Sequence, residues 1–195
     1  MLNELNIPRL EIPRIVILGG GFAGLKLARK LDSRYVQTVL IDENNYHTFQ
    51  PLMYQVATAG LEPDSIAYPL RKTLKNKMRT HIRMASVEKI KQEEQIVCTD
   101  IGDLHYDYLV IATGAKTNYF GNKHIEQYAM PMKDLTQSLD LRSSILQKFE
   151  AALNENDLLA RDSLMHFVIV GGGPTGVELA GALAELRTHV LPKDY

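Results

Sequence analysis

Short apolar runs alternate with helical patterns in the first part of the chain. Three runs of mostly β-branched or aliphatic residues stand between polar or glycine-containing segments, as is typical of buried parallel strands. They cover residues 15–18, 38–42 and 108–112, and we expect another parallel strand at 81–85. Between the first two, leucines and an alanine partly mark the apolar face of a helix expected over 23–32. The pattern predicts an α/β fold with a parallel sheet.

Two stretches between these runs follow other patterns. Residues 87–110 alternate between apolar and polar, which predicts a small antiparallel meander. Its expected strands are 87–92, 95–99 and 104–106. Residues 44–61 are polar and aromatic and contain a proline, so we expect an ordered loop with a short helix there. Pro69 is expected at the first position of a basic helix over 70–77, where a proline is tolerated.

The last third of the chain begins with an amphipathic helix. Apolar side chains over 135–153 recur every three or four residues, which predicts a helix of about five turns. An apolar strand is expected at 167–170, followed by glycines and a helix over 177–191. We expect a first domain over 1–120, and a helical connection with the beginning of a second domain over 121–195.

The same glycine fingerprint, G-x-G-x-x-G, follows two of the expected strands. The first copy has Gly19, Gly21 and Gly24, and the second has Gly171, Gly173 and Gly176. The first glycine of such a turn allows a sharp strand-to-helix connection, the second lets the backbone approach a pyrophosphate, and the third lets the helix pack on the strand. The helix amino terminus adds free N–H groups and a positive dipole end. Two copies predict two nucleotide cofactors, an arrangement typical of flavoproteins that pass a hydride from a nicotinamide to a flavin.

Asp42 is the acidic residue expected beside the first glycine turn. It ends the next strand, where a carboxylate accepts hydrogen bonds from a ribose. A negative charge there disfavours a 2′-phosphate, so the expected ligand is FAD or NAD(H) rather than NADP(H), and spacing alone leaves that choice open. Asp194 has the same spacing to Gly176, but no β-branched strand precedes it, and we attribute this match to coincidence.

Glu178 lies in the first turn of the helix that follows the second glycine turn. One interpretation is stabilisation of the helix through its dipole, by about 0.3–1 kcal/mol. The other is that the carboxylate points sideways from the pyrophosphate, toward the place where a nicotinamide ring and a flavin would meet. The residues alone leave both interpretations open.

Composition excludes several classes of protein. The 195 residues carry 22 Lys and Arg against 23 Asp and Glu, a net charge of -1, which gives no indication of a nucleic-acid partner. Cys98 is the single cysteine, so we expect neither a disulfide framework nor a paired-cysteine redox or metal site, and a reducing compartment fits. No signal-peptide pattern or membrane-spanning segment is found, and we expect the chain to be soluble.

Four segments carry a family resemblance. They are G-G-G-F-A-G at 19–24, D-E-N-N-Y-H-T-F-Q-P-L-M-Y-Q-V-A-T-A-G-L at 42–61, Y-D-Y-L-V-I-A-T-G-A at 106–115 and G-G-G-P-T-G-V-E-L-A-G-A-L at 171–183. With them the chain resembles the amino-terminal half of a type II NADH:quinone oxidoreductase, an FAD-dependent respiratory dehydrogenase. The resemblance implies a Rossmann-like FAD-binding domain, with the parallel sheet and the meander, followed by the start of a second Rossmann-like NADH-binding domain. Related disulfide reductases and sulfide:quinone reductases need paired cysteines, which this chain lacks.

The resemblance also implies the roles of particular residues. Asp42 would bind the FAD ribose, and Val87 would meet the adenine through its backbone. Around the rest of FAD would lie Gly19, Gly21, Phe22, Ala23, Gly24, His47, Pro51, Leu52, Thr113 and Gly114. NADH would be bound by Gly171, Gly173, Pro174, Thr175 and Gly176. Glu178 would lie near the contact between nicotinamide and flavin, as a candidate catalytic residue for proton handling at quinone reduction.

The implied function is transfer of a hydride from NADH to FAD and of electrons to a membrane quinone. The parent protein is expected as a peripheral protein at the cytoplasmic face of the inner membrane, and a homodimer stays open. Compared with the full length of this family, we expect this chain to be truncated. It would lack the rest of the NADH domain, a later G-D turn, the quinone site and the membrane-binding helices. Two alternatives remain, a soluble NADH-dependent flavin reductase with a protein acceptor and an inactive truncated FAD-binding module.

Overall fold

The computed structural model describes residues 4–194, which divide into two compact units. The first contains the described residues up to His47 together with Tyr68–Ala115, and the second contains Thr48–Ala67 and the described residues from Lys116 onward. These units are defined by contacts within the structure, whereas the limits expected at residues 120 and 121 are those of nucleotide-binding domains. The domain limits therefore stay a prediction.

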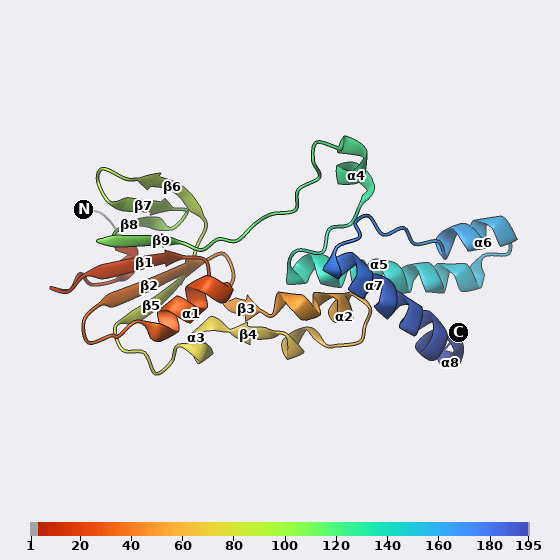
Figure 1. The fold of residues 1–195 in the computed structure, drawn as a ribbon, viewed down its shortest axis with the longest axis horizontal. Coiled ribbons are helices and arrows are strands. Elements are labelled where there is room, and N and C mark those ends of the chain that lie inside the picture. The colour runs from red at the N-terminus through yellow and green to blue at the C-terminus, as the bar shows by residue number, and fades with distance from the viewer. Residues whose placement is uncertain (1–3, 195) are drawn as a thin grey trace. The chain divides into compact units, whose positions relative to one another are not determined.

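A four-stranded parallel sheet forms the centre of the first unit (Figure 1). It consists of β1 (Arg14–Leu18), β2 (Gln37–Asp42), β5 (Thr80–Met84) and β9 (Tyr108–Ile111), in the order β5-β2-β1-β9. The helix α1 (Phe22–Lys30) connects the first two strands. All four predicted parallel strands are therefore confirmed, each to within a residue, and the order is that of one half of a doubly wound Rossmann sheet.

Apolar layers cover both faces of this sheet. Val16 and Val39 point into one cluster, which includes Val97 and Leu104 from the meander. Ile17 and Leu40 point into the other, with side chains from α1 and from the segment after β4. Successive side chains of a strand alternate between faces, so a strand covered on both sides is apolar throughout. This explains why the sequence shows continuous apolar runs here.

The predicted antiparallel meander is also confirmed. It consists of β6 (Val87–Lys91), β7 (Ile96–Thr99) and β8 (Gly102–His105), in the order β6-β7-β8. A bulge interrupts the register of β6 between Val87 and Lys89. Val87 therefore opens an edge strand at an irregular point.

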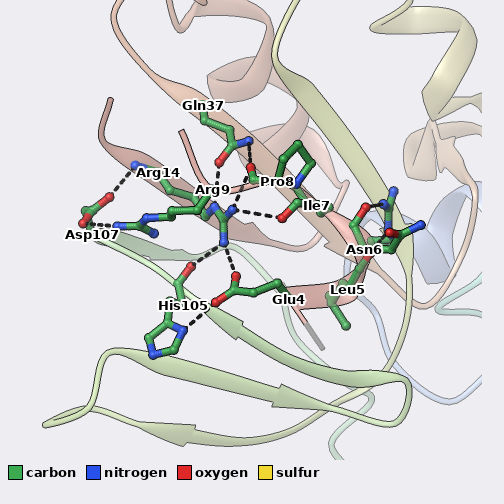
Figure 2. Close-up of polar contacts among 11 residues, drawn as sticks. Glu4, Leu5, Asn6, Ile7, Pro8, Arg9, Arg14, Gln37, His105 and Asp107 are labelled. Carbon is green, nitrogen blue, oxygen red and sulfur yellow. Dashed lines mark hydrogen bonds and ion pairs between the residues drawn. The ribbon is translucent and has the colours of Figure 1, made fainter. Parts of the chain in front are cut away.

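A buried arginine attaches the amino-terminal segment to the sheet, which the sequence did not predict. The Arg14 side chain is fully buried, and its Nε donates to Oε1 of Gln37 at 2.7 Å. Its guanidinium also donates to the carboxylate of Glu4, which lies in η1 (Glu4–Asn6), and to three backbone carbonyls. Figure 2 shows Glu4 between Arg14 and His105, whose Nδ1 donates to Oε1 of Glu4 at 2.6 Å. Every hydrogen-bonding group of the buried guanidinium is thus directed at an oxygen acceptor.

Residues 44–77 differ in detail from the prediction. The expected loop contains β3 (Tyr46–Thr48), η2 (Gln50–Leu52), α2 (Met53–Ala57) and η3 (Pro63–Ser65), and β3 forms a two-stranded sheet with β4 (Ala67–Pro69). The basic helix is shorter than expected, because α3 (Leu70–Thr73) ends before Leu74 and a turn at 74–76 follows. Pro69 precedes this helix as its N-cap rather than occupying its first turn.

Helices make up most of the second unit. They are α4 (Lys123–Tyr128), α5 (Leu135–Asn154), α6 (Leu158–Leu164), α7 (Pro174–Glu185), the π-helical η4 (Leu186–Val190) and α8 (Leu191–Asp194). The predicted amphipathic helix is confirmed as α5, which begins where the Asp134 carboxylate accepts the N–H of Gln137 at 2.8 Å. The helix α2 packs against α5 and α7, and Phe149 of α5 packs with Leu186. No helix among the described residues is long and apolar enough to cross a membrane.

The strand predicted at 167–170 is wrong. These residues have no strand assignment, and the side chains of Val168 and Val170 are 76% and 61% exposed. A strand needs a partner for its backbone N–H and C=O groups, and among residues 4–194 none pairs with this segment. The helix after it begins at Pro174, before the predicted Val177, and its apolar residue Val177 is 64% exposed.

Candidate functional site

The first glycine turn lies at the carboxyl end of β1, between the ends of β2 and β9. Gly19 has a φ of +102°, and a Cβ on it would lie 2.4 Å from the carbonyl oxygen of Ala112. A residue with a Cβ would be strained at this φ and would clash with Ala112, whereas glycine avoids both problems. The chain can therefore turn sharply here while it passes close to the segment that leaves β9. The N–H of Gly19 donates to Ile41 O at 2.7 Å, which connects the turn to β2.

The other two fingerprint glycines have opposite surroundings. A Cβ on Gly24 would lie 1.9 Å from the carbonyl oxygen of Gly19, so α1 packs directly on the turn. A Cβ on Gly21 would meet no atom within 4 Å. Gly21 is also the N-cap of α1, which means that the helix's first N–H groups and its positive dipole end face this open space. The geometry therefore leaves room for an anionic group where the fingerprint predicts a pyrophosphate.

Asp42 lies at the end of β2 and holds the glycine turn. Its carboxylate accepts the N–H of Gly20 at 2.5 Å and the N–H of Asn44 at 2.7 Å. A carboxylate offers about four acceptor sites, so two remain for further donors such as ribose hydroxyls. Asp42 thus lies beside the turn, and its contact with Gly20 is one that the sequence did not indicate. Its role toward a ribose stays a prediction.

Phe22 and His47 meet beside the same turn. Their rings are 5.0 Å apart at 81°, an edge-to-face contact. Nδ1 of His47 lies 3.0 Å from the carbonyl oxygen of Gly20, and because a carbonyl only accepts, Nδ1 is the protonated nitrogen. This leaves Nε2 as an acceptor for another group. His47, which lies in β3, is therefore positioned by the glycine turn itself.

Leu70 is a residue of this site that the sequence analysis missed. Its side chain is fully buried, and a Cβ on Gly20 would lie 2.8 Å from its Cδ1. A side chain at the middle glycine of the run, a free position in the fingerprint, would therefore press on the buried methyl groups of Leu70. The N–H of Leu70 donates to the carbonyl of Asn45 at 2.9 Å, which connects the start of α3 to the segment after β2. A glycine at a free position was the only signal of this contact.

The remaining predicted residues of the first unit border the same strand ends. The N–H of Ala112 donates to Leu18 O at 2.8 Å, and the chain then passes Gly19 as the exposed Thr113 and Gly114, the latter with a φ of +73°. On the other side, Ala85 donates to Asp42 O at 3.0 Å just before Val87 begins β6. The structure therefore brings Gly19–Gly24, Asp42, His47, Thr113 and Gly114 together at the carboxyl ends of the parallel strands. Val87 lies two residues after Ala85, which contacts Asp42 directly.

The second glycine turn repeats the local geometry in the second unit. Gly171 has a φ of +116°, and a Cβ on Gly176 would lie 2.0 Å from the carbonyl oxygen of Gly171. Gly173 is the N-cap of α7, Pro174 and Thr175 follow in its first turn, and Glu178 is exposed on the same helix. Unlike Gly19, Gly171 has open surroundings, since a Cβ on it would meet no described atom within 4 Å. Pro51 and Leu52 also belong to this unit, where they form part of η2.

Cys98 lies on β7 within the meander and is partly buried. Burial raises the pKa of its thiol, and a hydrogen bond with Asp103 raises it further. Because the thiolate is the reactive form of cysteine, this thiol is a poor nucleophile at neutral pH. The structure thus agrees with a structural role for the single cysteine.

The parallel sheet, its strand order and the two glycine turns define a dinucleotide-binding fold of the kind found in FAD- and NAD-dependent oxidoreductases. The chain belongs to the pyridine nucleotide-disulphide oxidoreductase family, whose model matches residues 13–191.

Similar proteins carry a more specific description. The chain is 41% identical over 182 residues to the type II NADH:quinone oxidoreductase Ndh of Mycobacterium tuberculosis, covering 91% of the chain and 39% of that protein. It is 32% identical to the external alternative NAD(P)H-ubiquinone oxidoreductase B3 of Arabidopsis thaliana, covering 93% of the chain and 34% of that protein. NDH2 of Plasmodium falciparum in complex with NADH superposes with a TM-score of 0.88 at 30% identity, over 94% of the chain and 39% of its own. The resemblance to type II NADH:quinone oxidoreductases is thereby confirmed, and the chain spans about 39% of the length of the Mycobacterium relative.

Proposed function

We propose that this chain holds FAD and contributes to an enzyme that oxidises NADH and passes electrons to a quinone. The observation that carries this proposal is the open cradle at Gly21, where a helix amino terminus faces space that a side chain would fill. The proposal for NADH and quinone is supported by the names of relatives that are at least 30% identical.

Each part of the first site has a proposed role toward FAD. The N–H groups at the start of α1 bind the pyrophosphate between Gly21 and Gly24, and the free acceptor sites of Asp42 bind the ribose. The backbone at Val87 contacts the adenine. Phe22 and Ala23 are proposed to border the pyrophosphate as well, and Thr113 and Gly114 to pass close to FAD. His47, Pro51 and Leu52 are proposed for the flavin side of the cofactor. Bound FAD supplies two-electron chemistry, accepting a hydride and releasing electrons to the next acceptor.

The second site is proposed for NADH. Gly171, Gly173 and Gly176 repeat the turn that lets a backbone approach a pyrophosphate, and Pro174 and Thr175 border it. Glu178 is proposed as the catalytic residue that holds a proton for quinone reduction, which its exposure on α7 permits. Peripheral attachment at the cytoplasmic face of a membrane is part of the same proposal, and a homodimer stays open.

The test is the visible spectrum of the purified chain after incubation with FAD and removal of free cofactor. We expect a bound flavin band, which Gly21→Ala weakens by at least about tenfold in affinity, or about 1.4 kcal/mol, because the added methyl occupies the pyrophosphate path. Gly172→Ala is the matched control, since it also adds a methyl in open space but lies outside the three fingerprint positions.

Anaerobic NADH separates the remaining alternatives. Bleaching of the bound flavin, followed by reoxidation with a water-soluble quinone, supports the proposed activity. Bleaching with reoxidation only by a protein acceptor supports the flavin reductase instead. A flavin band that NADH leaves unchanged indicates an FAD-binding module without hydride transfer, and equal flavin binding by Gly21→Ala and the unchanged chain contradicts the proposed FAD site.

A further inference from the structure

A second group of polar side chains lies on the edge strand of the first unit's sheet, outside the first glycine turn. Residues 71–83 contain six Lys and Arg, and no Asp or Glu occurs between Asp64 and Glu88. The whole chain has a net charge of only -1, so this segment is an isolated block of positive charge. Most such blocks are solvated faces, and a binding site requires that the cations converge.

The cations of this segment do converge, on a pocket of about 260 Å³. Four of its lining residues are the cationic Arg71, Lys75, Lys77 and Arg83, and His81 and Thr80 also line it. No acidic residue lines the pocket within the described part of the chain. The pocket runs along β5, the edge strand of the parallel sheet, so its walls are built partly from regular structure.

Two guanidinium groups meet at one backbone oxygen in this pocket. Arg71 donates to the carbonyl of Ile82 at 3.4 Å, and Arg83 donates to the same carbonyl at 3.1 Å. Arg83 is held further by the carbonyl of Leu5 at 2.9 Å. Neutral carbonyls thus orient both arginines without cancelling their charge, and no ion pair joins either one to a carboxylate within residues 4–194.

One carboxylate lies near the pocket without neutralising it. Asp32 is close enough to Lys77 to interact with it, but its hydrogen bonds go to Arg34, the main cause of its lowered pKa. The ammonium of Lys77 donates to the carbonyl of Leu31 at 3.0 Å. The charge of Lys77 is therefore partly compensated, whereas no ion pair with a residue of the described part of the chain compensates Arg71, Lys75 or Arg83.

We propose that this pocket binds a phosphate group, as a free phosphate compound or as the headgroup of a phospholipid. Paired guanidiniums match the oxygen geometry of phosphate, and each bond would be assisted by charge. A pocket of about 260 Å³ holds a phosphate with a small substituent, and is smaller than the sites of drug-sized ligands, which begin at about 300 Å³. The site lies on α3, the segment after it and β5, while the predicted cofactor residues of the first unit border the ends of β1, β2 and β9.

His81 gives this proposal a local readout. Burial lowers the pKa of its imidazole, and the charges of Arg83 and Arg14 lower it further. Arg71, Lys75 and Lys77 also face the pocket, all with positive charge. A phosphate bound among them stabilises the imidazolium and raises the pKa of His81. His47, beside the first glycine turn, reports separately on ligands that bind there.

The experiment is a titration of the full chain followed by the imidazole NMR signals. The probes are inorganic pyrophosphate, and separately vesicles of phosphatidylglycerol with neutral phosphatidylcholine vesicles for comparison. We expect saturable binding that raises the His81 pKa, and at least tenfold weaker binding in Arg71→Gln and Lys75→Gln. Lys72→Gln is the matched control, because it removes the same charge from the same segment, while Lys72 lies over the Tyr68 ring and outside the pocket.

Each outcome decides the proposal. A response of His81 to pyrophosphate supports a soluble phosphate ligand, and a response to phosphatidylglycerol vesicles alone supports a lipid headgroup. Equal weakening by Lys72→Gln and Lys75→Gln overturns the proposal, because binding would then follow net charge rather than the pocket. The proposal is also overturned if the His81 signal of the unchanged chain responds to neither probe. The variants are compared with the unchanged chain only where their thermal stability is equal.

Discussion

Gly24 and Gly21 are three residues apart in one turn, yet a methyl group added to each meets opposite surroundings. At Gly24 it would lie 1.9 Å from a backbone oxygen, and at Gly21 it would meet nothing within 4 Å. We expect Gly24→Ala to lower the free energy of unfolding by about 1–3 kcal/mol, since backbone must move to relieve the overlap. Gly21→Ala is expected to change it by less than about 0.5 kcal/mol. Urea unfolding measures both, and an equal loss in the two variants would contradict this account of the turn.

Arg14 allows a similar comparison between a buried and an exposed ion pair. Its guanidinium is fully buried and holds Glu4 and Gln37, whereas Arg9 is exposed and contacts Asp107. We expect Arg14→Met to cost about 3–5 kcal/mol of unfolding free energy, because the carboxylate and amide that face it lose their donor. Arg9→Met should cost at most about 1 kcal/mol. Comparable losses for the two variants, measured in urea, would show that burial does not set the strength of this network.

At the scale of elements, the prediction succeeded where local pattern and packing agree. The runs at 15–18 and 38–42 became strands because helices and the meander cover both faces of their sheet. The run at 167–170 has the same pattern but no partner strand among the described residues, so it is not a strand. The helix α3 is shorter than the predicted helix over 70–77, and a turn follows it from Leu74. Pattern thus predicts which segments can pair, and only the tertiary structure decides which do.

The difference between a segment that pairs as a strand and one that only has the pattern of a strand can be measured at Val16 and Val168. These two residues occupy the same position before their glycine turns. Val16 is fully buried in β1, and Val168 is 76% exposed. We expect Val16→Thr to lower the free energy of unfolding by about 1–3 kcal/mol, the cost of burying a hydroxyl without a partner. Val168→Thr should be within about 0.5 kcal/mol of the unchanged chain. A large loss for Val168→Thr would show that this segment is buried in solution.

At the scale of the whole molecule, the predictable part of the candidate site was the part encoded locally. Spacing along the chain located the fingerprint glycines and Asp42, and the structure places the first glycine turn and Asp42 together. Leu70 and Arg14 were not predicted, because each acts on residues distant in sequence. A buried arginine has no periodic signal, and Leu70 reads as an ordinary core residue. Residue roles toward the cofactors stay predictions, to be tested by the flavin and NADH experiments above.

Two groups link the stability of the whole fold to pH in separate ranges. Burial and the charges of Arg83 and Arg14 lower the pKa of His81 from its ordinary 6.5. Below pH 6.5 the unfolded chain therefore binds more protons at this site, and stability falls as the pH falls. Burial raises the pKa of Glu4, but hydrogen bonds from His105 and Arg14 outweigh it and hold this pKa below 4.5. The stability that Glu4 contributes is present above pH 4.5 and is lost as the pH falls through its folded value.

Urea unfolding over a series of pH values separates these contributions, with each variant as the control for the other. We expect His81→Gln to flatten the dependence of unfolding free energy on pH just below 6.5, because glutamine takes up no proton. Glu4→Gln should instead flatten it below 4.5. If His81→Gln retains the full slope just below 6.5, the surrounding arginines do not disfavour the imidazolium in the folded protein. The pocket proposed for phosphate would then lack the positive potential on which its binding depends.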